Sequence, residues 1–419
     1  MRVTRRDLLR GVAVVGSIGP ALGPAVARAE AAAEGSILHL RILATSDLHM
    51  AVTDWDYTQA KADPTIGLAR VMSLARAARA EVANTLLVDN GDLLQGNPLG
   101  DFVARPGGLA AGEVHPMIAV MNALGYDAAT VGNHEFNFGL DFLERALAGA
   151  RFPYVSANLR RADGSAFLPA TAVIERDFVD EGGATHRLRI GIVGSAPPQI
   201  MIWDKSRLEG RILAEDSVAA VERVVPELRR RCDVVVMLCH AGFSGGPRVP
   251  GLENAARHVA AVPGIDAMVT GHAHRVFPGP DYATLPDADA TRGTVHGVPT
   301  VMPGFWGSHL GVIDLRLERR DGRWTRIDGL AEARPIARRE QGRVIPLVEP
   351  DPEVEALIAP THAAALAWVE QPVGRLARPI HSFFVWAGHD PAGTVVAAAQ
   401  IDYARRLVAG TADAALPLL

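Results

Sequence analysis

Residues 128–139 read AATVGNHEFNFG, and this stretch decides the fold because it joins an apolar run to a polar cluster. The run Ala128–Val131 is short and apolar, which is typical of a strand buried on both faces. Asn133, His134 and Glu135 follow at once, behind a glycine that permits a tight change of direction. We predict a buried strand whose carboxyl end delivers polar side chains to a functional loop.

The same arrangement recurs in both directions along the chain. Four further apolar runs are Leu40–Ala44, Leu86–Val88, Val234–Leu238 and Ala267–Val269. The clusters that follow them are Asp47-Leu48-His49, Gly91-Asp92, His240 and Gly271-His272-Ala273-His274. Because functional loops gather at the carboxyl ends of strands in layered α/β proteins, we expect these clusters to meet at one edge.

Helical stretches alternate with the apolar runs, which predicts an α/β domain with helices covering the sheet faces. Further expected strands are Tyr154–Ala157, Leu188–Val193, Pro299–Met302 and Leu310–Leu317. The expected helices are Leu68–Val82, Val114–Leu124, Leu140–Ala148, Ser217–Arg230, Leu252–Val262, Glu353–Val369 and Gly393–Val408. The stretch Arg275–Gly297 is rich in Pro, Gly, Asp and Thr and predicts a long surface loop.

Composition excludes several classes of protein. The chain has 419 residues, of which 48% are hydrophobic, and only two are Cys. It is too apolar for a disordered chain and too poor in cysteine for a disulfide scaffold. A formal net charge of −5 gives no electrostatic basis for binding a nucleic-acid polymer. We interpret Cys232 and Cys239 as buried core thiols.

The first 29 residues have the pattern of an export signal. Arg5 and Arg6 precede an apolar run, and the stretch closes on Ala27-Arg28-Ala29. Paired arginines, an apolar run broken by Gly and Pro, and an Ala-x-Ala end predict a twin-arginine signal at 1–29. The alternative is an N-terminal membrane anchor. Export would make the protein periplasmic, with membrane association only through the signal.

The remaining chain divides into segments of different character. We expect a catalytic domain at 36–335, a linker at 336–351 and a second segment at 352–419, which Pro352 and Glu353 open as a helix. About 70 residues with two helices are few for an independent core. We therefore expect 352–419 to be an incomplete second α/β domain.

The polar clusters are rich in metal-binding groups. Imidazole suits Zn, Fe, Mn or Co, and a carboxylate can bridge two cations. Two such cations form a clamp for in-line displacement at phosphorus and activate water. Each cluster alone has a plainer interpretation: Asn133 could cap a helix, and His240 could be a core histidine. Five clusters in order behind five strands favour a metal site.

These motifs resemble the calcineurin-like metallophosphoesterase family. Asp-x-His, Gly-Asp, Gly-Asn-His-Glu, the histidine at a strand end and Gly-His-x-His all match its pattern. Within the family, the chain is similar to exported proteins of the 5′-nucleotidase type, from about Leu38 to the C-terminus. The resemblance implies a four-layer α-β-β-α sandwich.

The resemblance also implies roles for individual residues. One cation would be held by Asp47, His49, Asp92 and His274, and a second by Asp92, Asn133, His240 and His272, with Asp92 bridging. Asn133 and His240 would also help to place the substrate phosphate. His134 would be the catalytic histidine, which stabilises charge or protonates the leaving oxygen. The cations would be Zn, Mn, Fe or Co.

One position departs from the family pattern. Many 5′-nucleotidase relatives have an Asp three residues after the catalytic histidine, whereas this chain has Asn137. An amide can orient His134 but cannot stabilise an imidazolium as a carboxylate would. We interpret Glu135 as an acid at a helix start rather than a catalytic group. His309 resembles a family segment near the metal loops, and we favour a structural role for it.

The resemblance implies a hydrolase that opens 2′,3′-cyclic nucleotides to 3′-nucleotides and then releases phosphate from 3′-nucleotides. The expected partner is a small nucleotide, and the sequence predicts no oligomeric state. Two alternatives stay open. One is a 5′-nucleotidase, UDP-sugar hydrolase or other exported ester hydrolase of the family. The other is a catalytically impaired metal-binding fragment.

Overall fold

The computed structural model describes residues 34–417, so the expected export signal lies outside the described residues. The chain forms two compact units, one ending at Ala363 and the other beginning at Ala364. Among the described residues, no helix is both long enough and apolar enough to cross a membrane.

The first unit contains a six-stranded sheet in the order β18-β17-β1-β4-β5-β6. Its strands are β1 (Ile37–Thr45), β4 (Thr85–Asp89), β5 (Ala128–Thr130), β6 (Tyr154–Val155), β17 (His309–Arg320) and β18 (Arg323–Pro335). Strands β1, β4, β5 and β6 pair in parallel, whereas β17 pairs antiparallel with both β1 and β18. The carboxyl ends of three parallel strands that precede predicted clusters therefore lie at one edge.

A second sheet has the order β14-β15-β16-β12-β11-β9-β8, with β13 also paired to β16. Its strands are β8 (Thr171–Val179), β9 (Thr185–Ser195), β11 (Val234–Cys239), β12 (Ala267–Thr270), β13 (Val276–Phe277), β14 (Ala288–Asp289), β15 (Thr294–Val295) and β16 (Val298–Pro303). The central strands β9, β11, β12 and β16 pair in parallel. The two remaining predicted clusters follow β11 and β12.

The two sheets pack face to face, and alternate residues of β11 are buried on its two faces. Val234, Val236 and Leu238 are buried in the cluster that joins the two sheets. Val235 and Met237 alternate with them and are buried against the helical layer. A strand with both faces covered must be apolar throughout, which explains the unbroken hydrophobic run.

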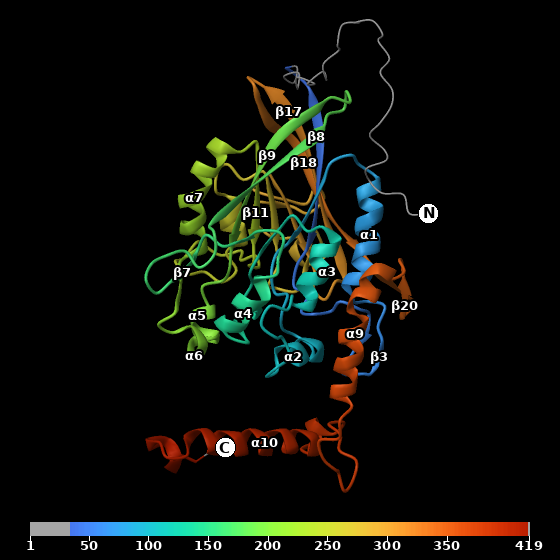
Figure 1. Ribbon diagram of the computed structural model, residues 1–419, viewed down its shortest axis with the longest axis vertical. Coiled ribbons are helices and arrows are strands. Elements are labelled where there is room, and N and C mark those ends of the chain that lie inside the picture. Colours follow the sequence, from blue (N-terminus) through green and yellow to red (C-terminus); the bar gives the residue numbers. More distant parts are fainter. Residues whose placement is uncertain (1–33, 418–419) are drawn as a thin grey trace, which may run out of the picture. The chain divides into compact units, whose positions relative to one another are not determined.

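The first unit also contains helices α1 (Leu68–Ala80), α2 (Pro98–Ala104), α3 (Pro116–Leu124), α4 (Leu140–Leu147), α5 (Ile200–Trp203), α6 (Lys205–Leu208), α7 (Ser217–Arg231) and α8 (Ala256–Ala260). Helices α7 and α8 pack on the outer face of the second sheet. Helix α7 lies on one side of the strands and α1 on the other (Figure 1). The predicted four-layer α-β-β-α sandwich is confirmed.

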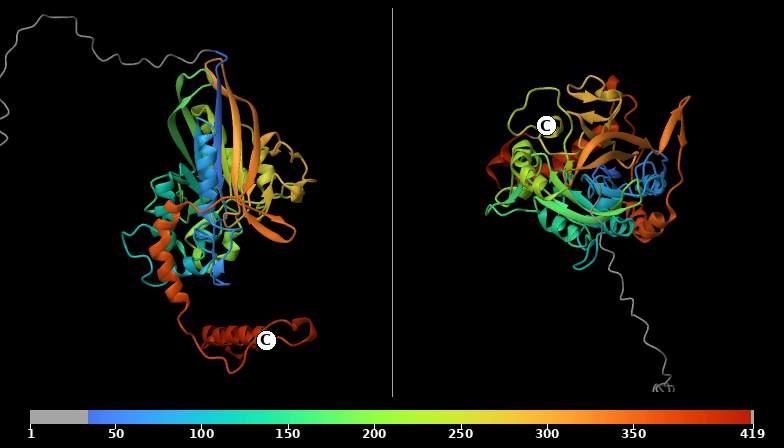
Figure 2. Two further views of the ribbon diagram at one scale, coloured as in Figure 1. Left: turned by 90° about the vertical axis from the view of Figure 1, so that its right-hand side faces the viewer. Right: turned by 90° about the horizontal axis from the view of Figure 1, so that it is seen from above.

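Several elements differ from the sequence-based expectations. The long strands β8 and β18 were not expected, and with β9 and β17 they extend to one end of the unit (Figure 2). They alternate exposed polar and buried residues, as Arg323, Trp324 and Thr325 do, so they lack an apolar run. The expected loop 275–297 contains the two-residue strands β13, β14 and β15. Residues 336–351 contain a hairpin of β19 (Ala337–Glu340) and β20 (Arg343–Pro346).

Helix α9 (Pro352–Val369) begins in the first unit. The second unit also contains α10 (Pro391–Val408), whose first turn is capped by Asp390 Oδ1, which accepts the Gly393 N–H at 2.9 Å. The expected helix at 393–408 is thus observed. Cys232 and Cys239, in the first unit, are buried free thiols, as predicted.

Candidate metal centre

The loops after five strands bring the predicted ligands together. Asp47 and His49 follow β1, Asp92 follows β4, and Asn133 follows β5. His240 follows β11 directly, and His272 and His274 follow β12. Five of these residues have a left-handed backbone: Asp47, His49, Asp92, His272 and His274, with φ between 47° and 67°. Such conformations cost energy in side-chain-bearing residues and concentrate at functional sites.

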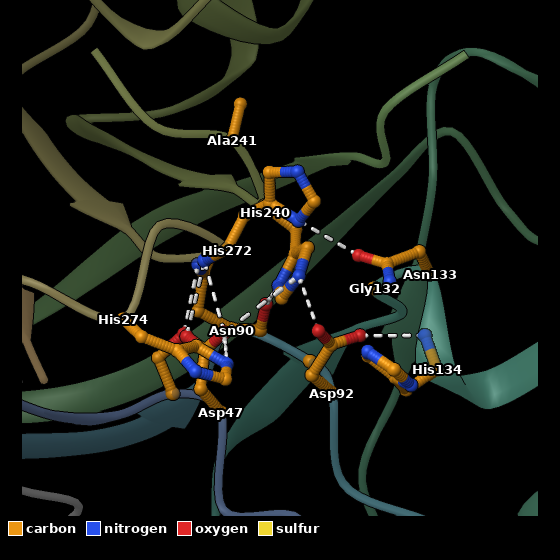
Figure 3. Close-up of polar contacts among 12 residues, drawn as sticks. Asp47, Asn90, Asp92, Gly132, Asn133, His134, His240, Ala241, His272 and His274 are labelled. Carbon is orange, nitrogen blue, oxygen red and sulfur yellow. Dashed lines mark hydrogen bonds and ion pairs between the residues drawn. The ribbon is translucent and has the colours of Figure 1, made fainter. Parts of the chain in front are cut away.

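The side chains form two overlapping groups with the spacing of metal ligands. Asp47, His49, Asp92 and His274 form one, and Asp92, His240 and His272 form the other. In each group the potential ligand atoms all lie within 4.8 Å of one another. Asn133 joins the second group because its Oδ1 lies 2.8 Å from His272 Nδ1. Asp92 belongs to both groups, and Figure 3 shows its carboxylate between His240 and His134.

The hydrogen bonds of His240 show that the cluster fits a cation. Its Nδ1 lies 2.7 Å from the Asn90 carbonyl oxygen, so Nδ1 carries the hydrogen and Nε2 presents a lone pair. This Nε2 is buried without a hydrogen-bond partner, and Asp92 Oδ2 lies 3.0 Å away. Two facing lone pairs repel unless a proton or a metal ion lies between them.

His49 repeats this arrangement in the first group. Its Nδ1 lies 2.7 Å from the Gln95 carbonyl oxygen, which directs Nε2 toward the cluster. That Nε2 lies 2.9 Å from His274 Nε2 and 4.0 Å from Asp92 Oδ2. Each group therefore contains nitrogen and oxygen lone pairs aimed at a common point, which is the donor set that divalent transition metals bind.

Electrostatics support the same conclusion. Burial raises the pKa of Asp47 to about 7 and lowers that of His49 to about 4. Burial also disfavours charge on His240, but the carboxylates of Asp92 and Asp47 outweigh it and raise the pKa of His240 to about 10. The buried carboxylates of Asp47 and Asp92 are thus stabilised by positive charge beside them, which a divalent cation would supply.

Two glycines leave room for the cluster. A Cβ added to Gly132 would collide with Asp92 Oδ1 and the His240 ring. A Cβ added to Gly271 would collide with Asp47 Oδ2 and Ser46 Oγ. Each glycine therefore allows its loop to approach ligands that come from another strand.

Glu135 has a different role from the one expected. The sequence suggested an acid at a helix start, and Glu135 does lie in the first turn of a short 3-10 helix (His134–Phe136), but its buried carboxylate reaches the neighbouring loop that carries Asp92. It accepts the backbone N–H groups of Asp92 at 2.8 Å, Leu93 at 2.6 Å and Leu94 at 3.2 Å. It also accepts the Gly132 N–H at 2.5 Å. Glu135 therefore ties the loops after β4 and β5 to each other.

His134 lies beside the cluster and is held at two points. Its backbone N–H donates to Asp92 Oδ1 at 2.7 Å, and its ring Nδ1 lies 2.6 Å from Asn137 Oδ1. The ring centroid lies 4.9 Å from that of His49. His309, by contrast, belongs to neither ligand group, and its Nδ1 contacts Ser308 Oγ at 2.9 Å.

The sequence analysis missed three residues that contact the site. Glu253 Oε1 lies 2.9 Å from His272 Nε2, and the Trp203 ring stacks on His272 with centroids 5.6 Å apart. Asp204 contacts Asn137. All three lie outside the strand-end motifs, so the pattern that placed the candidate ligands gave no signal for them.

Comparison with known proteins places this geometry in a family. The family model for calcineurin-like phosphoesterase matches residues 40–276. The chain is 42% identical over 393 residues to the 2′,3′-cyclic-nucleotide 2′-phosphodiesterase/3′-nucleotidase of Salmonella typhimurium, covering 93% of this chain and 60% of that protein. It is 40% identical to the trifunctional nucleotide phosphoesterase YfkN of Bacillus subtilis, covering 91% of this chain and 26% of that protein.

A solved structure shows the same architecture. The crystal structure of the calcineurin-like phosphoesterase YfkN from Bacillus subtilis superposes with a TM-score of 0.75 at 40% identity, covering 80% of this chain and all of that chain. The chain spans about three fifths of the length of the cyclic-nucleotide phosphodiesterase relatives, 58% to 60%. The matched family model, these identities and the shared fold lead to one conclusion: the chain belongs to the calcineurin-like phosphoesterase family.

Proposed function

We propose that this chain hydrolyses 2′,3′-cyclic nucleotides to 3′-nucleotides and then releases phosphate from 3′-nucleotides. The observation that carries the proposal is the position of Asp92, whose carboxylate belongs to both groups of candidate ligands. Support for the substrate comes from relatives at 41% to 42% identity that are named for these two reactions.

We propose two divalent cations, Zn, Mn, Fe or Co, held by the two ligand groups with Asp92 shared. Asp47, His49 and His274 would complete one site, and Asn133, His240 and His272 the other. Bound cations of this kind supply positive charge to phosphoryl oxygens and lower the pKa of water toward neutrality. Asn133 and His240 would also help to place the phosphate.

His134 has the position of a proton donor. Asn137 holds its Nδ1, which leaves Nε2 for exchange with the substrate. In the first reaction, water adds to phosphorus while the bond to O2′ breaks. His134, protonated on both ring nitrogens, gives the Nε2 proton to O2′ and is left in its neutral Nδ1–H form, and the proton lost by the attacking water restores Nε2–H for the next cycle. In the second reaction, the bond to O3′ breaks in the same way, which yields a nucleoside and phosphate.

We further propose that residues 1–29 direct export to the periplasm and that 36–335 form the catalytic domain. The pattern around Arg5 and Arg6 supports the first point. The two ligand groups lie between Asp47 and His274, which supports the second.

Rates on three substrates test the proposed activity. The full chain, supplied in turn with each of the four metals, is assayed on 2′,3′-cyclic AMP, 3′-AMP and 5′-AMP, with bound metal measured in parallel. We expect turnover of the first two substrates to exceed that of 5′-AMP. His134→Ala should reduce kcat by about 10²–10⁴-fold while metal content is retained. Preferential hydrolysis of 5′-AMP would instead favour a 5′-nucleotidase, and bound metal without turnover would favour a metal-binding module.

A further inference from the structure

Asn137 stands where many relatives have a carboxylate, and its surroundings explain why. Its side-chain Oδ1 lies 2.6 Å from His134 Nδ1. Its Nδ2 donates to both oxygens of Asp204, at 3.0 Å and 3.2 Å. The amide thus bridges the imidazole and a carboxylate that lies 67 residues further along the chain.

The side-chain oxygens of Asp204 accept their hydrogen bonds from the Asn137 amide. It occupies the N-cap position of α6, where an aspartate ordinarily accepts an N–H of its own helix, yet its side chain makes no capping hydrogen bond. The residue is only 6% exposed, and the nearest cation is Arg207, whose Nε lies 4.0 Å away. A buried carboxylate needs donors, and the Asn137 amide supplies one to each of its oxygens.

The segment that carries Asp204 also touches the metal cluster independently. Trp203, the preceding residue, stacks on His272 with an interplanar angle of 28°. Helices α5 and α6 lie beside α4 in Figure 1, near the loop that carries Asn137. The Trp203–Asp204 pair therefore contacts two different residues of the proposed site.

Charge fixes the orientation of the amide. If the Asn137 amide were flipped, its oxygen would face both oxygens of Asp204 at about 3 Å, which is repulsive. In the observed orientation Oδ1 must accept from His134, so Nδ1 carries the hydrogen and Nε2 is directed elsewhere. Hydrogen bonds in such a chain also polarise one another and strengthen each link.

We propose that Asp204 is a positioning residue that acts through Asn137 to hold His134 in its Nδ1–H tautomer. The proposal rests on the hydrolytic role of His134 proposed above. It also explains the departure at position 137, because an aspartate there would set two carboxylates about 3 Å apart. In this chain the carboxylate of Asp204 acts on His134 through one intervening residue, Asn137, whose amide is hydrogen-bonded to both.

A charge-swap series tests the proposal. The variants are D204N, N137D and the double variant N137D/D204N, with D141N on the exposed face of α4 as the matched control. We expect D204N to lower kcat about tenfold with little change in KM, and N137D to lower it further through like-charge repulsion. The double variant reverses the pairing: the carboxylate stands at 137, where it accepts from His134, and the amide at 204 donates to it. Its kcat should exceed that of N137D by about tenfold.

A spectroscopic measurement gives a readout besides turnover. Nitrogen-15 NMR of the zinc-loaded full chain, with the His134 signals assigned through a His134→Gln variant, reports which ring nitrogen carries the hydrogen. The Nδ1–H form should dominate in the unmodified chain and in D141N, and should decline in D204N. Wild-type kcat and tautomer in D204N, or a double variant no better than N137D, would overturn the proposal.

The two proposals fail in different ways. If the unmodified chain hydrolysed no nucleotide, the tautomer in D204N would still decide the role of Asp204. If nucleotides were hydrolysed but D204N matched the unmodified chain in tautomer and kcat, only the role of Asp204 would be lost.

Discussion

Glu253 Oε1 lies 2.9 Å from His272 Nε2, while Nδ1 of the same ring faces Asn133 Oδ1 at 2.8 Å. The carboxylate therefore fixes both the plane and the tautomer of the imidazole, with the hydrogen on Nε2. Carboxylates that hold the outer nitrogen of a ligating histidine raise its basicity and are part of many metal sites. Glu253 has that relation to the second proposed cation site.

Replacing Glu253 by Gln should weaken metal binding rather than the fold. We expect affinity for Zn to fall about 10–100-fold, because the imidazole loses the partner that orients it. Competition with a chelator of known affinity measures the change. Glu209→Gln is the control, since Glu209 is exposed and only faces Lys205 at 3.6 Å. Equal affinities in the two variants would contradict a role for Glu253.

Replacing Asp92 by Ala should remove both metals together. The carboxylate belongs to both ligand groups, so each group loses a ligand and the charge that balances a cation. Metal content by elemental analysis should fall in step with turnover to the background rate. Loss of one metal with the other retained would contradict a shared position for this carboxylate.

Replacing Glu135 by Gln should loosen the loops that carry Asp92 and Asn133. The buried carboxylate accepts four backbone N–H groups, and an amide presents an NH₂ in place of one acceptor. Leaving buried donors unsatisfied costs about 1–3 kcal/mol each. We therefore expect a lower free energy of unfolding in urea and weaker metal retention. An unchanged unfolding midpoint would show that the loops do not depend on this contact.

The grouping of the candidate metal ligands could be predicted from sequence because two regular patterns coincide. Buried strands such as Val234–Cys239 leave an unmistakable apolar run, and parallel strands end at a common edge. The position of a polar residue directly after such a run, such as His240, therefore follows from the sequence pattern. The glycines beside the clusters add to this signal, because Gly132 and Gly271 allow ligands from different strands to approach.

The supporting residues could not be predicted in the same way. Asp204 looks like an ordinary helix N-cap, and only the fold shows that its side chain turns toward Asn137 instead. Glu135 lies in the first turn of a short 3-10 helix (His134–Phe136), as a dipole-stabilising acid would, yet its carboxylate accepts an N–H from the loop after β4. Contacts between side chains on separate loops leave no periodicity, so they follow from tertiary structure alone.

A last prediction concerns acid stability away from the site. Burial opposes ionisation of Asp314, but hydrogen bonds from His39 and Arg41 outweigh it and lower the pKa of Asp314 to about 2, from an ordinary 3.8. Nε of Arg41 donates to Oδ1 at 2.8 Å and its Nη2 donates to Oδ2 at 2.9 Å, joining β1 to β17. Since the pKa is lower in the folded state, the carboxylate stabilises the fold above about pH 4, and this contribution disappears as the pH falls toward 2.

Asp314→Asn should therefore lower the free energy of unfolding near pH 7 by about 1–2 kcal/mol, after allowance for partial solvent screening. Urea unfolding at several pH values checks this, and the curves for the variant and the unmodified chain should converge below about pH 4. Asp177→Asn is the control, because Asp177 is exposed and faces Arg187 at 3.3 Å, so its removal should cost under about 1 kcal/mol at any pH. A difference for Asp314→Asn that stayed constant with pH would instead indicate lost packing, because packing between β1 and β17 does not depend on the ionisation of a carboxylate.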